Sequence, residues 1–182
     1  MITRSTSFVV VACILNFAPL SNVMAKDVQD GVARAQVVQS LSAQAINDLQ
    51  FGRITVSELE GGEVIIAPMP GVVQYTGGVR GECRGAGACS ASPARFDVRG
   101  EPLRRYTIAI EAEVEAIGER TGEILRVERL RTDKTLADPA VLTSALDEFG
   151  KDLLTIGGTL VVPAGSVTDL FRAELPITLA YE

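Results

Sequence analysis

The segment YTIAIEAEVE, residues 106–115, is the clearest structural signal in the sequence. Apolar side chains occupy every second position from Tyr106 onward, and Glu111, Glu113 and Glu115 lie between them. A period of two places successive side chains on opposite faces of a β-strand. The segment therefore predicts a strand with one buried face and one solvated, acidic face.

Shorter runs of the same kind lie on both sides of this segment and are bounded by glycine or proline. The expected strands are residues 63–67, 72–76, 95–99, 125–130, 153–156, 159–162 and 174–181. Many short strands separated by turn residues are typical of an antiparallel sandwich, whereas parallel sheets need crossover helices. The sequence therefore predicts an all-β fold, an immunoglobulin-like antiparallel β-sandwich.

The last expected strand has its own pattern. Its apolar positions alternate with Pro176, Thr178 and Ala180 and run almost to the end of the chain. These positions are Leu175, Ile177, Leu179 and Tyr181. Because Pro176 has no N–H to donate to a ladder, part of this strand is expected at an edge or end of its sheet.

Two stretches are compatible with either helix or strand. Residues 33–45 alternate between apolar and polar side chains, which favours a strand, although they are also rich in alanine and glutamine. Residues 137–149 favour one short helix. Asp138 is a suitable cap, Pro139 suits the first helical position, and apolar residues recur at helical spacing up to Phe149.

The N-terminus has the features of a cleavable signal peptide. Arg4 precedes an apolar run of 13 residues, 8–20, and small residues precede the bond after Ala25. The run is too short to span hydrocarbon, which needs about 20 residues. We therefore expect residues 1–25 to be removed, residues 26–35 to form an N-terminal extension and residues 36–182 to form the sandwich. The predicted location is the periplasm, cell surface or extracellular space of a Gram-negative bacterium.

Composition argues against several classes of function. The formal net charge is −6, and nucleic-acid binding calls for a basic face. The sequence contains no histidine and no tryptophan, which removes histidine-based triads and Cys/His zinc sites. We therefore expect no enzyme, no cofactor, no metal site and no nucleic-acid partner, and no membrane contact after the signal is removed.

The cysteine count supports export. Cys13 lies within the expected signal peptide, which leaves Cys83 and Cys89 in a glycine-rich segment. An even number of cysteines in an oxidising compartment indicates a disulfide, and two more ligands would be needed for a metal. We expect Cys83 and Cys89 to form a disulfide, with free thiols as the alternative.

Other candidate sites have simpler explanations. The three glutamates of residues 111–115 could serve as paired carboxylates or calcium ligands, but a strand buried on one face also needs a solvated side. The glycines of residues 77–87 lack the lysine and hydroxyl residue of a phosphate-binding loop. Neither Ser90 nor Ser92 has a suitable base at a motif spacing, so no nucleophile is predicted.

The order of several short motifs carries a family resemblance. These are DLQFG (48–52), GGEV (61–64), YTGGV (75–79), ARFDVRG (94–100), YTI (106–108), GGTLVV (157–162) and AY (180–181). From about Leu41 to the end, the chain resembles the secreted bacterial domain of unknown function 4402. It departs from the family pattern in having Asp169-Leu170-Phe171 in place of a glycine-tyrosine pair, and in placing Pro176 in the last strand.

That family is in turn similar to pilin and spore-coat subunits with immunoglobulin-like domains. The resemblance implies a non-catalytic structural subunit of a surface or fimbria-like assembly. Such subunits lack a final strand, and a neighbour's extension or a periplasmic chaperone fills the place by strand addition. The assembly strand would then contain Leu175, Ile177, Leu179 and Tyr181. The alternatives are a self-completed sandwich and a stand-alone periplasmic or surface module that binds a small ligand or sugar.

Overall fold

The computed structural model describes residues 32–82, 90–134, 136–138 and 141–182, and these residues form β-strands but no helix. In chain order the strands are β1 (Ser42–Asn47), β2 (Ile54–Val56), β3 (Gly62–Ile66), β4 (Val73–Gly77), β5 (Val79–Gly81), β6 (Ala94–Arg99), β7 (Arg105–Ile110), β8 (Val114–Gly118), β9 (Ile124–Thr132), β10 (Leu136–Asp138), β11 (Val141–Ala145), β12 (Lys151–Val162), β13 (Phe171–Arg172) and β14 (Ile177–Tyr181). Residues 37–182 form one compact unit. The predicted signal peptide and residues 26–31 of the extension lie outside the described residues.

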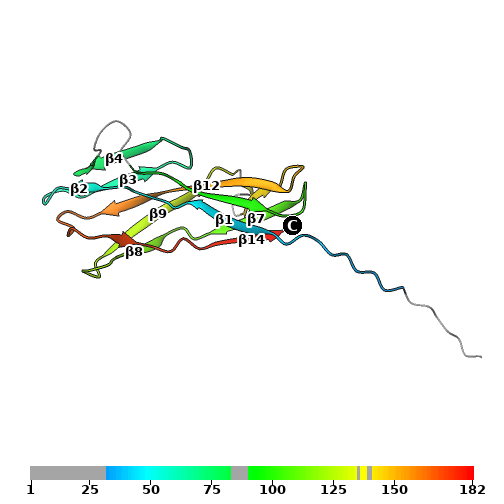
Figure 1. Cartoon of the computed structure of the whole chain (residues 1–182). Helices are drawn as coiled ribbons and strands as arrows, with labels where there is room; N and C mark the ends of the chain where they lie inside the picture. The colour runs from blue at the N-terminus through cyan, green and yellow to red at the C-terminus, as the bar shows by residue number, and fades with distance from the viewer. Residues whose placement is uncertain (1–31, 83–89, 135, 139–140) are drawn as a thin grey trace, which may run out of the picture. The chain divides into compact units, whose positions relative to one another are not determined.

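The strands form three antiparallel sheets (Figure 1). The largest has the order β1-β6-β12-β9-β8-β13, with β3 paired to the second half of β12 and β4 paired to β3. A four-stranded sheet has the order β10-β11-β7-β14, and β2 pairs with β5. The orders β1-β6-β12-β9 and β7-β14 match strands A-B-E-D and C-F of an immunoglobulin-like sandwich. The predicted fold class is confirmed.

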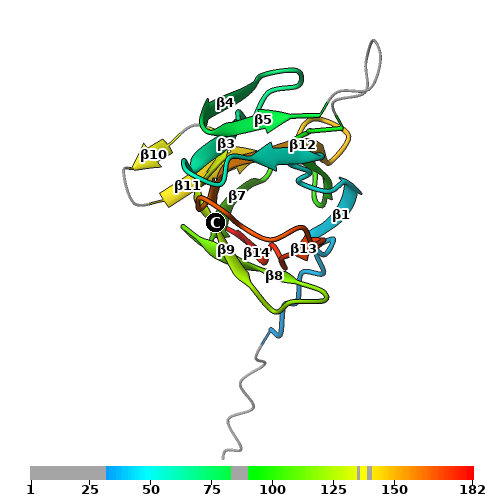
Figure 2. The same cartoon turned by 90° about the vertical axis from the view of Figure 1, so that its left-hand side faces the viewer.

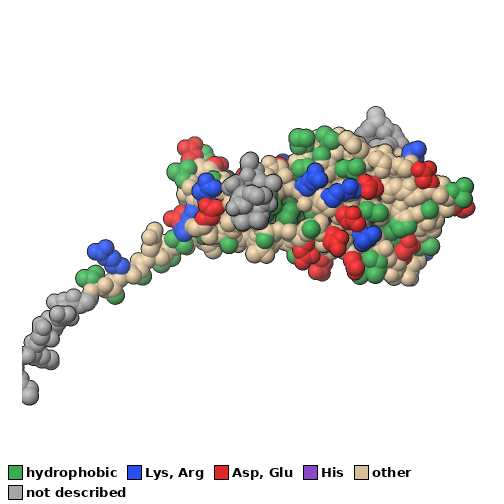
Figure 3. Space-filling model, turned by 180° about the vertical axis from the view of Figure 1, so that it is seen from behind, with side chains coloured by type: hydrophobic (Ala, Val, Ile, Leu, Met, Phe, Trp, Pro, Cys, Tyr) green, Lys and Arg blue, Asp and Glu red, His purple; other side chains and the backbone are tan. Residues whose placement is uncertain are grey.

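The core lies between these sheets, which curve around it in the view of Figure 2. Its fully buried side chains come from both large sheets and include Val64, Val98, Tyr106, Leu154 and Ile156. Burial alternates along β9 and β7, as a half-buried strand requires. On the face seen in Figure 3, acidic and basic side chains lie side by side, and neither sign forms a continuous patch.

The expected helix over residues 137–149 is wrong. Within that stretch the described backbone forms β10 and β11, and β11 pairs with β7 from Leu142 opposite Ile108 to Ala145 opposite Arg105. Leu142 and Leu146 are four residues apart, a spacing that fits a helix and a strand equally well. Pairing with β7 decides between them, and Phe149 is then left exposed.

Residues 106–115 do not form a single strand. β7 ends at Ile110 and β8 starts at Val114, and the two belong to different sheets. The alternation continues across the break because both strands turn one face to the same core. The sequence period therefore records which side chains are buried, but it does not record that the chain crosses from one sheet to the other.

Residues 153–156 and 159–162, expected as two strands, form the single strand β12. Gly157 and Gly158 lie inside it, at a register shift opposite β9. A Cβ atom on Gly157 would lie 2.2 Å from the carbonyl oxygen of Ile66, and one on Gly158 would lie 2.9 Å from a methyl carbon of Leu130. These glycines allow close approach to β3 and β9 and do not end the strand.

The expected strand over residues 33–45 forms only in its last part. Residues 32–41 have no strand pairing, and β1 pairs with β6 from Ser42 opposite Arg99 to Asn47 opposite Arg95. The N-terminal residues of this stretch alternate in the sequence, but they are exposed and pair with no strand of the described residues. Alternation alone does not make a strand without a partner to accept its hydrogen bonds.

Candidate functional site

β14 has a paired edge and a free edge. The Glu182 N–H donates to the Arg105 carbonyl oxygen at 3.2 Å, which makes these two residues a hydrogen-bonded pair. Hydrogen-bonded pairs alternate along an antiparallel ladder, so Thr178 and Ala180 also bond to β7. The backbone N–H and C=O groups of Ile177, Leu179 and Tyr181 therefore point away from β7. No strand of the described residues pairs with them.

The predicted assembly residues all pack against the core. Ile177, Leu179 and Tyr181 lie in β14, and Leu175 precedes it. All four side chains are only half-buried. The structure thus brings them together on the inner side of the edge strand β14 and of the segment that leads into it, where apolar surface remains accessible to water.

The neighbouring edge, β1, is also uncovered. Ala43 and Ala45 lie opposite Val98 and Phe96 of β6 in the register, so they share the inner face of the sheet with them. Val98 is fully buried, yet both alanines are exposed. In a complete immunoglobulin-like sandwich, strand G would pair with the strand that β14 represents. Within the described residues this position is empty, and the inner side chains of both edge strands border it.

Tyr181 fixes the end of β14. Its hydroxyl donates to the carbonyl oxygen of Gln39 at 2.9 Å and accepts from the Glu101 N–H at 2.7 Å. The Arg104 guanidinium lies 4.5 Å from the centre of its ring. The side chain therefore holds together the segment before β1, the β6–β7 turn and the last strand.

The segment where the sequence departs from the family pattern also has a clear structural role. The Asp169 carboxylate accepts hydrogen bonds from the backbone N–H groups of Arg120, Thr121 and Leu170, and from the Thr121 hydroxyl at 2.7 Å. The Thr121 hydroxyl and these N–H groups lower the pKa of Asp169. Asp169 thus fastens the β8–β9 turn to the chain that enters β13 and leads to β14.

A polar cluster lies around Asp152, on the side of β7 that pairs with β11 and not with β14. One carboxylate oxygen accepts from the Tyr106 hydroxyl at 2.7 Å and from the Ser144 hydroxyl at 2.6 Å. The other accepts from Lys134 Nζ at 2.7 Å and from the Leu153 N–H at 2.8 Å. The side chains of Lys134 and Asp152 are each 15% exposed. The cluster joins β12 of the large sheet to β7 and β11 of the four-stranded sheet.

These contacts shift the pKa values of Asp152 and Tyr106. Burial alone would raise the pKa of Asp152, but hydrogen bonds from Lys134, Ser144 and Tyr106 outweigh it and lower the pKa. Burial and the bond to Asp152 raise the pKa of Tyr106 above its ordinary value. Lys134 and Ser144 bind the same carboxylate, and the amine is held in an ion pair with Asp152. The arrangement fits a structural link between sheets.

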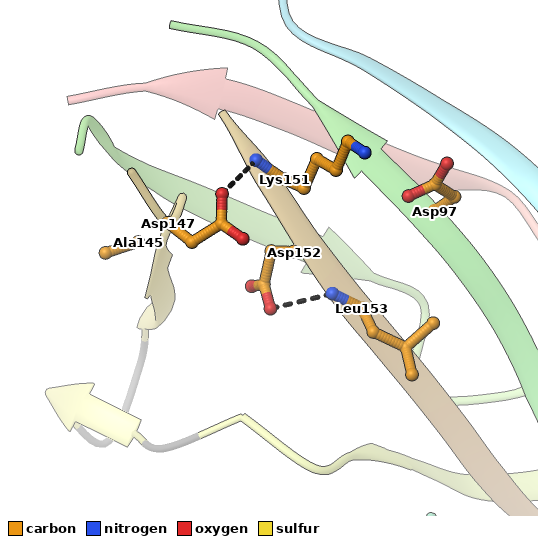
Figure 4. A pocket seen from close by; sticks show the side chains of 6 residues that line it. All are labelled: Asp97, Ala145, Asp147, Lys151, Asp152 and Leu153. Atoms are coloured by element: carbon orange, nitrogen blue, oxygen red, sulfur yellow. Dashed lines mark hydrogen bonds between the residues drawn. The ribbon is translucent and has the colours of Figure 1, made fainter. Parts of the chain in front are cut away.

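A pocket of about 390 Å³ opens beside this cluster (Figure 4). Three carboxylates line it, and each already has partners. Asp97 pairs with Arg99 at 2.7 Å, and Asp147 accepts from the N–H groups of Phe149 and Lys151 at 2.8 Å. Asp152 is bound as described above. Each of the three carboxylates therefore has at least one hydrogen-bond or ion-pair partner within the described residues.

A larger groove, about 860 Å³, lies where β14 begins. It is lined by glutamates, arginines and small or apolar side chains, and by no aromatic residue. The lining residues are Glu111, Glu113, Val114, Glu115, Ile117, Arg126, Arg172, Ala173, Glu174 and Pro176. The glutamates of the sequence segment 106–115 are exposed, as expected for a solvated face.

Other predicted features fall outside what the structure describes. Cys83 and Cys89 both lie in the undescribed segment 83–89. The described residues contain no group of three or more His, Cys, Asp or Glu side chains placed to hold a metal ion. They also contain no helix with the length and apolar character needed to cross a membrane.

Sequence reasoning did not identify the Asp152 cluster. Its members Tyr106, Lys134, Ser144 and Asp152 are spread over the chain, and only sheet pairing brings them together. A single aspartate beside an apolar run was the one available signal.

The chain was compared with protein families, curated proteins and solved structures. A family model described as Domain of unknown function (DUF4402) matches residues 41–181. No curated protein and no solved structure matches the chain.

Proposed function

This chain belongs to the DUF4402 family, and we propose that it is a non-catalytic, exported structural subunit that joins a surface or fimbria-like assembly by strand addition. The free edge of β14 carries this proposal. Unpaired backbone groups at an edge, next to accessible apolar side chains, form a template for another strand. An added strand would satisfy the outward groups of Ile177, Leu179 and Tyr181 and cover Ala43 and Ala45.

The proposed donor is the N-terminal segment of a second copy, residues 26–36, which comprises the expected extension 26–35 and Gln36, the last residue before the compact unit. A periplasmic chaperone is proposed to occupy the same edge before assembly. Residues 32–36 are exposed and unpaired, and β14 contains 5 residues, so the segment is long enough to cover it. The donor strand would bind mainly through backbone hydrogen bonds. It needs no large side chains, because the half-buried Ile177 and Leu179 already fill much of the inner face.

Hydrogen exchange of the mature protein tests this proposal. In isolated subunits the amides of Thr178 and Ala180 should be protected because they bond to β7, and those of Ile177, Leu179 and Tyr181 should exchange quickly. In assembled material, or after a peptide of residues 26–41 is added, the second set should become protected. Removal of residues 26–36 should leave a folded protein that no longer assembles. A stable monomer with unchanged exchange at all five amides would contradict strand addition.

Export has its own measurements. The intact mass of secreted protein should correspond to a chain that begins at Lys26, without a lipid. A mass that includes residues 1–25 would contradict cleavage of the signal peptide.

The disulfide is tested by alkylation. Alkylation without reduction should label neither Cys83 nor Cys89. A double serine variant should lose about 2 kcal/mol of unfolding free energy, the value expected for closing a short loop. Alkylation of Cys83 or Cys89 in the unreduced protein would contradict the disulfide.

The rival function, a module that binds a small ligand or sugar, receives less support. Sugar sites commonly use exposed aromatic faces, and neither pocket beside the sheets has an aromatic lining residue. The carboxylates of the smaller pocket are already hydrogen-bonded or ion-paired.

A further inference from the structure

Two tight turns lie at the end of the sandwich that carries the C-terminus (Figure 1). The first joins β6 to β7, with the Arg104 N–H donating to Glu101 at 3.3 Å. The second joins β11 to β12, with the Gly150 N–H donating to Asp147 at 3.0 Å. Residues 100–104 and 147–150 are called the double turn below.

Backbone hydrogen bonds lock the double turn into one unit. The Leu103 N–H donates to the carbonyl oxygen of Asp147 at 3.0 Å, and the Gly100 N–H donates to that of Gly150 at 2.9 Å. The Asp147 carboxylate adds bonds from the N–H groups of Phe149 and Lys151, the second of which is drawn in Figure 4. The side chains on the double turn therefore stand on a fixed backbone.

Leu103 has an unfavourable backbone conformation, and burial of its side chain does not compensate for it. It follows Pro102 in a turn with φ of 61°, at the position where a type II turn favours glycine or asparagine. Its side chain is nevertheless 73% exposed. Arg129, the other non-glycine residue with positive φ in the described chain, lies beside the register shift between β9 and β12. No such pairing irregularity accounts for Leu103.

Other large apolar side chains share this end. Phe149 is 73% exposed, and it is the one exposed aromatic residue of the described chain. Val37 is 96% exposed and Val38 is 39% exposed. Both precede Gln39, which Tyr181 connects to the β6–β7 turn. Val37, Val38, Leu103 and Phe149 are called the end surface below.

We infer that the end surface docks onto a second copy of this chain, at the groove where β14 begins. The inference rests on the proposed strand addition and specifies which further surfaces meet. A strand that completes the sandwich runs antiparallel to β14, so its C-terminal end lies beside Ile177. If residues 26–36 provide five paired residues, at most six remain before Val37, and they span at most about 20 Å.

This length places the donor's end surface close to the acceptor's groove. Pro176, which directly precedes Ile177 of β14, lines the groove, as does Glu174 three residues before Ile177. The groove also offers Val114 and Ile117, and the Ile117 side chain is more than half exposed. Contact between two different surfaces of identical chains is heterologous, so each added copy offers a further docking surface, and the chains extend as a filament when the rotation between them does not close a ring.

Assembly of the mature full-length chain tests the inference through Leu103→Gly and Phe149→Ser, with Leu59→Ser as the matched control. Leu59 is 95% exposed, but belongs to neither surface. Leu103→Gly should raise the melting temperature of the subunit by a few degrees because it relieves the positive φ, yet it should slow filament growth at least fivefold. Phe149→Ser should slow growth similarly without lowering the melting temperature. Leu59→Ser should grow at the wild-type rate.

Cross-linking tests where the surface docks. A mixture of Phe149→Cys and Ile117→Cys chains should form a disulfide-linked pair under mild oxidation, and a mixture of Leu59→Cys and Ile117→Cys chains should not. End-surface docking would be wrong if the Leu103→Gly and Phe149→Ser chains both form filaments at the wild-type rate while assembly still requires residues 26–36. Strand addition would be unaffected by that result. Assembly that survives removal of residues 26–36 would overturn strand addition. A wild-type chain that never assembles would overturn both.

Discussion

β12 and β14 are both apolar strands, but they occupy opposite environments. β12 pairs with β6 and β3 along one edge and with β9 along the other, and its segment from Leu154 to Leu160 is buried throughout. β14 pairs only with β7, and its inner side chains are half-buried. The comparison shows that the sheet is paired on both sides at β12, whereas at β14 one edge remains open to another strand.

The largest expected effect is at the centre of β12. Leu154→Ala should lower the free energy of unfolding by about 3 to 4 kcal/mol, because Leu154 is fully buried and the cavity is enclosed by paired strands. Chemical denaturation of the isolated subunit gives this value. Assembly should not change it, since an added strand would not reach β12. A loss below about 1 kcal/mol would show that β12 is not the centre of the core.

The Asp152 cluster, at the start of β12, should have the next largest effect. Asp152→Asn removes the nearer carboxylate from the largely buried Lys134 amine, leaves only Asp133 at 4.0 Å, and should cost about 2 to 3 kcal/mol. Asp97→Asn is the control, because its ion-pair partner Arg99 is more than half exposed, and this pair should contribute less than about 1 kcal/mol.

The pH dependence of stability tests the contribution of the Asp152 ion pair. The pKa of Asp152 is lowered in the folded protein, so its stabilising contribution is complete above the unfolded pKa of about 3.9. The contribution is lost as the pH falls through the lower folded value. The stability difference between wild type and Asp152→Asn should therefore shrink below about pH 4. A difference that stays constant down to pH 2 would rule out the ion pair as its source.

The smallest effect is expected in β14. Leu179→Ala should cost the isolated subunit about 1 to 2 kcal/mol, because its side chain is only partly removed from water. The cost should rise when the edge is filled, by an added peptide of residues 26–41 or in assembled material. Equal costs with and without the peptide would show that no strand covers Leu179.

The fold class was predictable because burial on one side of a sheet imposes a period of two on the sequence. Residues 63–67, 72–76 and 95–99 were expected as strands, and β3, β4 and β6 lie there within one residue. The last strand was expected to begin at residue 174 and to contain Pro176, but β14 begins at Ile177, directly after this proline, and it does lie at the edge of its sheet. The four apolar residues expected to line that strand also share one half-buried face.

Strand boundaries and partners were settled by tertiary structure. Residues 106–115 carry one continuous pattern but contribute to two sheets, because both strands face the same core. Gly157 and Gly158 resemble a strand end in the sequence, yet they lie inside β12 because β3 and β9 approach too closely for a side chain. Leu142 and Leu146 fit helix and strand equally, and only pairing with β7 selects the strand.

The candidate sites divide in the same way. A local pattern identifies the inner face of β14, since its residues are neighbours in the sequence and share one period. The free edge, the Asp152 cluster and the double turn depend on contacts between residues far apart in the chain, such as Tyr106 with Asp152 and Leu103 with Asp147. The sequence by itself determined which side chains seek burial. Only the tertiary structure decided which backbone groups would be left without a partner, because hydrogen bonding in a sheet is satisfied between strands and not within them.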